Sequence, residues 1–379
     1  MKKLFYEDSH LAHFDATVTG CTPTEGGYLI TLDATAFYPE GGGQPSDTGT
    51  LGETSVLSVQ EVGEDIFHLC DKPLPVGQLV AGVIDWPRRL DLMQQHTGEH
   101  MVSGVIHKRY GYHNVGFHIG ADVVTIDFDG PIPQEDLQSI ENEVNAAIWQ
   151  NLPVKCDYPA QEELPQVPYR RKRDLPWPVR IVDIPQIDQC ACCGTHVKRT
   201  GEIGLVKLFS CVKFHQGVRI EMACGRRALE ILSATYAQNR LVSQAFSAKP
   251  LQTGAAAQRM NEALAAEKFR SAGLEKRLFS YIAQSYAGKD LALHFEETLS
   301  AVANRELCDA IAKECAVAIT LSGTDETGYS LCIISRTQDA KVLGTAAVQA
   351  LNGRGGGKRE AFQGNVSATR QKIEEFFRS

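Results

Sequence analysis

The spacing of apolar residues changes its period near residue 90, and this change constrains the fold more than any other feature of the sequence. Before it, short runs such as YLITLDAT and EDIFHLCD alternate apolar and polar residues between Gly, Pro and Asp turns, which is typical of half-buried strands. After it, residues 88–111 show helical spacing and end in Gly111, a common helix terminus. An all-β domain is therefore predicted to precede a mixed one.

The mixed region continues with further strands and a second helix. Strands are expected at 123–129, 179–184, 204–214 and 217–225, and Pro133 precedes the second helix, whose apolar residues recur every three or four positions. These elements together predict an α+β domain.

Helical spacing dominates the next segment, and a small α/β region follows it. The helical segment is interrupted at Lys249-Pro250, because the residue before proline avoids helical geometry. The last region alternates strands and helices and contains a glycine-rich turn at Gly355–Gly357. The predicted fold class is α+β and multidomain, with parts at 1–89, 90–225, 226–286 and 287–379.

The bulk composition favours a cytoplasmic protein that does not enter a membrane. Apolar residues make up 43% of the chain and charged residues 22%, and the N-terminus MKKLFYEDSHLAHF lacks an apolar run of signal-peptide length. No stretch approaches the roughly 20 apolar residues of a membrane span. The net charge of −8 argues against a protein that coats nucleic acid, although basic patches such as Arg170–Arg173 allow a local footprint.

Two pairs of residues with metal-ligand spacing indicate a zinc site. His96 and His100 are four residues apart on a predicted helix, so both rings can reach one ion. Cys192 and His196 are four residues apart in ACCGTHV, and Zn²⁺ accepts mixed nitrogen and sulfur ligands. One Zn²⁺ per chain is therefore predicted; the alternative is a set of buried histidines bonded to backbone carbonyls.

The segment HTGEH also matches H-x-x-E-H, the inverted zinc-protease motif. In that interpretation Glu99 is a general base and the chain is a metalloprotease. The motif then needs a downstream glutamate ligand, whereas this chain offers a cysteine–histidine pair.

Five segments, read in order, resemble the alanyl-tRNA editing proteins, the AlaX family, which are free-standing relatives of the alanyl-tRNA synthetase editing domain. The matching segments are FYPEGGGQPSDTG, QQHTGEH, CCGTHVKRTGEIG, GVRIE and RGGGKREAFQG. The last resembles the DHHA1 domain, as in the long form of the family. The resemblance implies an N-terminal β-barrel, an α+β editing domain shared with threonyl- and alanyl-tRNA synthetases, a helical arm and a small C-terminal α/β DHHA1-like domain.

The resemblance also implies a reaction and a ligand set. The implied activity is trans-editing, the deacylation of mischarged Ser-tRNA(Ala), with Gly-tRNA(Ala) as a second substrate. No segment resembles the ATP-binding domain of a synthetase. The family pattern C-x-G-T-H selects Cys192 rather than Cys193 as the ligand beside His196.

Candidate site residues follow from these motifs. The catalytic candidates are Glu99 and Thr195. The residues proposed to bind substrate lie in the two glycine-rich segments and near the zinc motifs, and they are Gly41, Gly42, Gly43, Gln44, His118, Thr200, Gly355, Gly356, Gly357 and Lys358. The expected partner is tRNA(Ala), and a homodimer through the helical arm or the C-terminal domain is an open alternative.

In a second hypothesis, the protein binds tRNA but does not catalyse a reaction. Four protein ligands describe a closed shell, which is typical of structural zinc, whereas catalytic zinc normally keeps one position open. The chain would then be a tRNA-binding module with a purely structural zinc.

Overall fold

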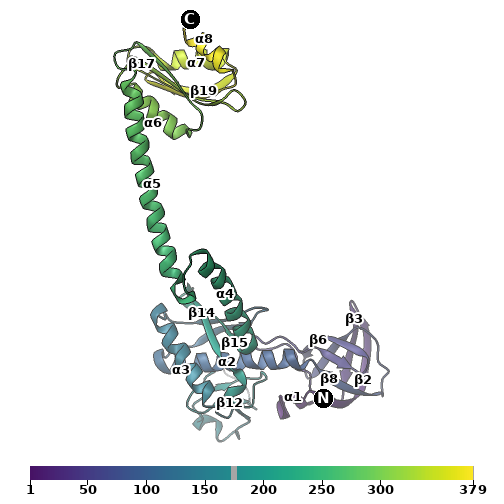
Figure 1. The fold of residues 1–379 in the computed structure, drawn as a ribbon. Coiled ribbons are helices and arrows are strands. Elements are labelled where there is room, and N and C mark those ends of the chain that lie inside the picture. Colours follow the sequence, from purple (N-terminus) through teal and green to yellow (C-terminus); the bar gives the residue numbers. More distant parts are fainter. Residues whose placement is uncertain (172–176, 379) are drawn as a thin grey trace. The chain divides into compact units, whose positions relative to one another are not determined.

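The computed structural model describes residues 1–171 and 177–378 (Figure 1). Lys172 and Arg173 of the predicted basic patch lie outside the described residues. The chain forms two compact units, Met1–Arg240 and Leu241–Ser379. None of the helices among the described residues combines the length and apolarity that crossing a membrane requires.

The N-terminal region is a closed six-stranded barrel, with the order β2-β3-β7-β6-β5-β8. Alternate residues of these strands point inward, and Val18, Ile30, Ile66 and Val80 belong to one buried apolar cluster. The short elements β1, α1 and β4 lie beside it. The bounds are β1 Lys2–Lys3, α1 Leu4–Glu7, β2 His13–Thr24, β3 Gly27–Leu32, β4 Ala34–Thr35, β5 Gly49–Leu51, β6 Thr54–Val62, β7 Asp65–Cys70 and β8 Leu79–Ile84.

The predicted change of period coincides with the start of α2, Trp86–Tyr110. The Asp85 side chain accepts a hydrogen bond from the Arg88 amide at the start of the helix, and Gly111 ends it with a φ of 75°. The expected helix and its glycine terminus are therefore confirmed. Unlike a surface helix, α2 is buried around most of its circumference between residues 92 and 106.

Two antiparallel sheets and a second long helix surround α2. The four-stranded sheet has the order β14-β15-β10-β9, and the three-stranded sheet has the order β11-β12-β13. Helix α3 packs against α2 and β14 over an apolar core that includes Ile126, Val144 and Ile220. The bounds are β9 Asn114–Ile119, β10 Val124–Phe128, η1 Gln134–Asp136, α3 Leu137–Trp149, β11 Lys155–Asp157, η2 Leu164–Gln166, β12 Ile181–Ile184, β13 Asp188–Ala191, η3 Thr200–Ile203, β14 Val206–Phe214 and β15 Gly217–Cys224.

The glycine-rich segment 37–48 is a loop of the barrel that ends at the start of β5, and it reaches the α+β region. Gly43 has a φ of 86°, and a Cβ atom there would lie 2.5 Å from the Phe117 carbonyl oxygen in β9. The Gly43 carbonyl accepts a hydrogen bond from the Ile119 amide. A residue without a side chain therefore lets this loop lie directly against β9.

The helical segment is broken between α4, Gly225–Ala245, and α5, Thr253–Gln284, with η4, Pro250–Gln252, between them. The break falls at the predicted Lys249-Pro250 step. The second unit also contains a five-stranded sheet, with the order β16-β17-β18-β20-β19, and three shorter helices. The bounds are β16 Leu291–Glu296, α6 Ala301–Ile311, β17 Val317–Thr324, β18 Gly328–Ser335, α7 Ala340–Ala350, β19 Gly353–Lys358, β20 Ala361–Val366 and α8 Arg370–Arg378.

The predicted turn at residues 355–357 is wrong. These glycines lie inside the edge strand β19, where Gly355 pairs with Gly364 and Gly357 with Phe362. Glycine usually marks a turn, but a strand also accepts it where another backbone approaches closely. The tight turn lies further along, between Lys358 and Ala361.

A buried histidine makes the stability of the barrel depend on pH. His68 is fully buried, with Nδ1 3.0 Å from the Ile30 carbonyl oxygen and Nε2 2.8 Å from the Thr35 hydroxyl. Burial lowers the pKa of His68 from 6.5 to about 4. The unfolded chain therefore takes up a proton at a higher pH than the folded chain. The stabilisation is complete above about pH 6.5 and is lost as the pH falls through the folded-state pKa.

We expect the free energy of unfolding of the wild type to fall by about 3 kcal/mol more than that of His68→Gln between pH 6.5 and pH 4. Denaturant titrations at a series of pH values measure this difference. His13→Gln, which changes an exposed histidine of the same barrel, is the control and should keep the wild-type slope. Equal slopes for the wild type and His68→Gln would contradict the assignment.

Candidate metal centre and the pocket beside it

Helix α2 and the loop after β13, called here the ligand loop, bring the four predicted ligands together. The four residues, called here the metal group, are His96, His100, Cys192 and His196. Each offers one ligand atom, and these atoms lie within 4.8 Å of one another. The three histidines are almost completely buried, and Cys192 is half-buried. The neighbouring Cys193 is exposed, is hydrogen-bonded to Tyr6 and does not belong to the group.

The outer ring nitrogen of each histidine already has a partner. Each Nδ1 faces an oxygen of a buried side chain, so each Nε2 points toward the other ligands. The pairs are His96 with Gln44 Oε1 at 2.7 Å, His100 with Asp188 Oδ2 at 3.0 Å and His196 with Thr97 Oγ1 at 3.2 Å. Such contacts hold the rings in the orientation that a metal ion requires.

One atom of the group lacks a hydrogen bond. His196 Nε2 is buried and has no hydrogen-bond partner among the described residues. Buried polar atoms are nearly always satisfied, so this atom indicates a bond to an ion. Three imidazoles and one thiol are also the donor types that Zn²⁺ accepts. The residues present therefore fit a zinc ion.

Electrostatics prepares the cysteine for binding a cation. Burial alone would raise the pKa of the Cys192 thiol, but the positive charges of His96 and His100 and a hydrogen bond from His100 hold it well below its ordinary value. Burial lowers the pKa of His196 to about 3, so this ring is neutral. Burial opposes protonation of His100 too, yet the Cys192 thiolate and Asp188 hold its pKa well above the ordinary range. Metal binding would therefore release a proton from His100.

A pocket of about 520 Å³, called here the central pocket, lies beside this group. His96, His100 and Cys192 form one part of its wall, and Gly42 of the barrel loop forms another. Its remaining lining comes from α2, β9, the strands next to the ligand loop and the segment before them, and comprises Glu99, His113, Asn114, Phe117, Arg170, Arg171, Pro178, Val179, Arg180, Cys190, Ala191 and Cys193.

Glu99 faces the central pocket together with the two histidines of α2. One of its oxygens, Oε1, accepts hydrogen bonds from Ser103 at 2.5 Å and from Asn114. The other oxygen, Oε2, lies 4.0 Å from His100 Nε2. Glu99 is thus a buried carboxylate that is held in place within reach of the candidate metal ligands.

Gln44 and Thr195 are buried and support the ligands without lining the central pocket. Gln44 Oε1 accepts from the Thr195 amide at 3.2 Å as well as facing His96, and Gln44 Nε2 donates to the Thr195 hydroxyl at 2.8 Å. Both side chains therefore position the ligand loop.

Other predicted site residues lie away from the metal group. The buried Thr200 hydroxyl accepts from the Leu152 amide and donates to the Ala147 carbonyl, which binds η3 to the end of α3. His118 is exposed on β9 and shares a separate hollow with Gly41–Gly43. Gly355–Lys358 belong to the second unit.

Several residues of the site were not predicted. Arg180 donates from Nη1 to the Cys192 and Gly194 carbonyls, both at 2.9 Å, and so holds the ligand loop. Asp188 and Asn114 orient His100 and Glu99. None of them belongs to a recognisable motif, and only their positions in strands or at strand edges beside the ligands could have drawn attention to them.

The second ligand pair lies inside a region with a known family model. Residues 179–221 match the threonyl and alanyl tRNA synthetase second additional domain. Alanyl-tRNA editing protein Aarsd1 of Mus musculus is 28% identical, with 99% of this chain and 96% of that protein covered. The chain is a relative of the alanyl-tRNA editing proteins along nearly its whole length. Aarsd1-B of Xenopus laevis is also 28% identical, with 96% of this chain and 91% of that protein covered.

A synthetase shows the same relationship over part of its length. Alanine--tRNA ligase of Thermofilum pendens is 32% identical over 97% of this chain but only 42% of the ligase. This relative of the editing proteins therefore corresponds to one portion of that larger enzyme.

We expect Gln44→Ala to weaken Zn²⁺ binding by about 10–100-fold, because His96 loses the partner that orients its ring. Competition with a chromophoric chelator measures the affinity, and circular dichroism checks the fold. Gln78→Ala, at an exposed glutamine of the same barrel, should bind Zn²⁺ like the wild type. An unchanged affinity in Gln44→Ala would show that the contact does not position His96.

Proposed function

We propose that this chain is an editing hydrolase that acts in trans on mischarged alanine tRNA and cleaves the ester between serine and the tRNA. The observation that carries this proposal is the buried His96, His100, Cys192 and His196 group beside the central pocket. It occurs in a chain that is similar over nearly its whole length to proteins named alanyl-tRNA editing proteins. Glycine on the same tRNA is the second candidate substrate.

The four ligands would hold one Zn²⁺. When bound, this ion supplies Lewis-acid chemistry, polarising an ester carbonyl or lowering the pKa of a water molecule. The low pKa of Cys192 and the neutral His196 support the assignment, because zinc binds thiolate and neutral imidazole.

Glu99 is the proposed general base. Ester hydrolysis requires a group that removes a proton from the attacking water. Ser103 and Asn114 hold Oε1, so the carboxylate is fixed, and Oε2 can accept the proton at the wall of the central pocket. Ser103 and Asn114 are then positioning residues that act through Glu99.

The barrel loop and the second unit would bind the substrate. Gly42 lines the central pocket, where a residue without a side chain leaves room for the ligand. In the second unit the exposed strand residues Gly355–Lys358 are proposed to contact tRNA phosphates through their backbone and the lysine charge. A homodimer through the helical arm or the second unit remains part of the proposal.

A purely structural zinc in a tRNA-binding protein is the second candidate function. It is favoured by one specific feature, the set of four protein ligands, which suffices for a closed tetrahedral shell. The two candidates differ in whether the pure protein hydrolyses an aminoacyl ester.

We expect Cys192→Ala to lower the rate of Ser-tRNA(Ala) deacylation by at least about 100-fold, because the ion is lost with its thiolate ligand. Cys21→Ala is the matched control and should keep the wild-type rate, since Cys21 is a partly exposed cysteine of β2 that lies outside both the ligand group and the central pocket. Deacylation of Ser-, Gly- and Ala-tRNA(Ala) is measured, together with zinc content and thermal unfolding.

Glu99→Gln separates catalysis from structure. The amide preserves the shape of the side chain, so we expect the zinc content and melting temperature to stay near those of the wild type while the deacylation rate falls by about 100-fold or more. If the Glu99→Gln variant hydrolyses the ester at the wild-type rate, Glu99 is not the general base. A pure wild-type protein that binds zinc but hydrolyses none of the three esters would favour the structural alternative.

A further inference from the structure

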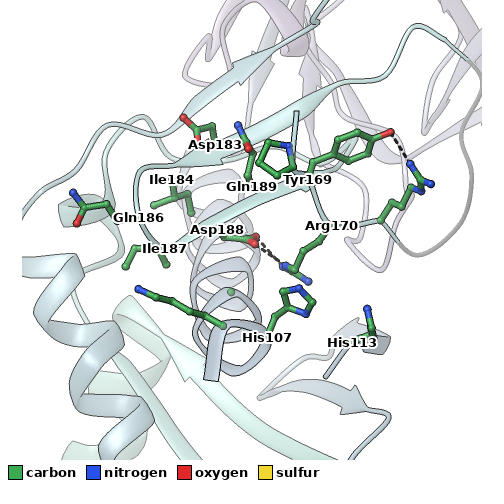
Figure 2. A pocket seen from close by; sticks show the side chains of 14 residues that line it. His107, His113, Tyr169, Arg170, Asp183, Ile184, Gln186, Ile187, Asp188 and Gln189 are labelled. Atoms are coloured by element: carbon green, nitrogen blue, oxygen red, sulfur yellow. Dashed lines mark hydrogen bonds and ion pairs between the residues drawn. The ribbon is translucent and has the colours of Figure 1, made fainter. Parts of the chain in front are cut away.

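A second hollow, the Lys108 groove, adjoins the central pocket and plays no part in the proposed hydrolysis. Its volume is about 690 Å³, and it lies between the C-terminal turn of α2, residues 168–171 and the segment 183–189 (Figure 2). A volume of this size is within the range of sites that bind small ligands or parts of larger ones.

The groove and the central pocket share part of their walls. His113, Arg170 and Arg171 line both. The Arg170 guanidinium donates to Asp188 Oδ1 at 2.6 Å and to Oδ2 at 2.8 Å, and Asp188 in turn holds His100 (Figure 2). A ligand in the groove would therefore lie next to the metal group, separated from it by one ion pair.

The side chains of the groove combine positive charge with ring faces. Lys108 is exposed, and Arg171 provides a second positive charge in the lining. His107 and His113 lie with their ring centroids 5.2 Å apart, and Asp129 holds His113 Nδ1 at 3.1 Å while the ring stays exposed. Tyr169 adds a half-buried aromatic ring.

This combination matches single-stranded RNA. Cations contact the phosphates of a single strand, and its unpaired bases stack on flat side chains. Asp183 lines the groove as well, and a carboxylate accepts a hydrogen bond from the amino group of cytosine. An acidic peptide would use the cations, but it has no bases to stack on the flat side chains or to donate a hydrogen bond to Asp183.

We propose that the Lys108 groove binds the nucleotides that precede the terminal adenosine at the 3′ end of the tRNA. This inference rests on the proposed function, which places the aminoacyl ester of that adenosine at the metal group. The groove then holds the single strand that leads to the reacting ester, and its contacts position the ester through the backbone of the RNA.

Binding of unacylated RNA tests the groove without requiring hydrolysis. The probes are the RNA trinucleotide CCA and adenosine 5′-monophosphate, titrated into the full zinc-loaded chain by calorimetry at two salt concentrations. We expect the trinucleotide to bind at least about tenfold more tightly than the monophosphate, and the difference to shrink at high salt.

Lys108→Glu and Tyr169→Leu should each remove most of this difference, because both residues line the groove and neither lines the central pocket. Their affinity for the monophosphate should stay within about twofold of the wild type, since its site is elsewhere. Lys72→Glu, a charge reversal at an exposed lysine of the barrel, is the matched control and should bind both probes like the wild type. Thermal unfolding shows whether each variant is folded.

Three results would overturn the inference. They are equal affinity of the wild type for the two probes, an affinity difference that survives both groove substitutions, and equal competition by hexaglutamate, which would reveal a simple patch of charge. The proposed function can fail separately. If the chain binds CCA through the groove but hydrolyses no aminoacyl ester, the groove assignment stands and the proposed hydrolase activity is wrong.

Discussion

A buried ion pair between Arg89 and Asp47 fastens the barrel loop to α2, and the metal group depends on it. Arg89 Nε contacts both Asp47 oxygens, at 2.9 and 3.1 Å, and Nη2 donates to the Ala36 carbonyl at 2.6 Å. Neither side chain is open to solvent. Removing one partner of such a pair typically costs about 3–5 kcal/mol, because the other charge is left buried and uncompensated. Gln44 lies three residues from Asp47, so the pair also determines where Gln44 meets His96.

From this junction the site is built by successive contacts. Gln44 joins the barrel to the ligand loop through its hydrogen bond to Thr195. Arg180, which directly precedes β12, donates to the Gly194 carbonyl and so holds the same loop. Each contact removes a degree of freedom from a ligand before an ion arrives, which is how surrounding polar groups strengthen metal binding. The barrel therefore has a chemical role: it supplies a wall of the central pocket and the residue that orients His96.

The local elements followed closely from the sequence, whereas the roles of the polar residues did not. The helix 86–110 was predictable because capping residues and apolar spacing are local signals. Gly355–Gly357 were misread as a turn, because pairing with β20 is a contact between strands and leaves no local mark. Thr195 and Thr200 are equally close to the ligand motif in sequence, yet one supports Gln44 and the other binds the end of α3.

The sequence by itself determined the four candidate metal ligands, the change from strand to helix near residue 90 and the resemblance to alanyl-tRNA editing proteins. Ligand spacing along a helix or a short loop is a property of neighbouring residues, so it can be read directly. Only the tertiary structure decided that Gln44, Thr97 and Asp188 hold the histidine rings and that Glu99 faces the central pocket. It also decided that the Lys108 groove opens beside the metal group. These contacts join residues up to 99 positions apart in the sequence, and folding alone brings them together.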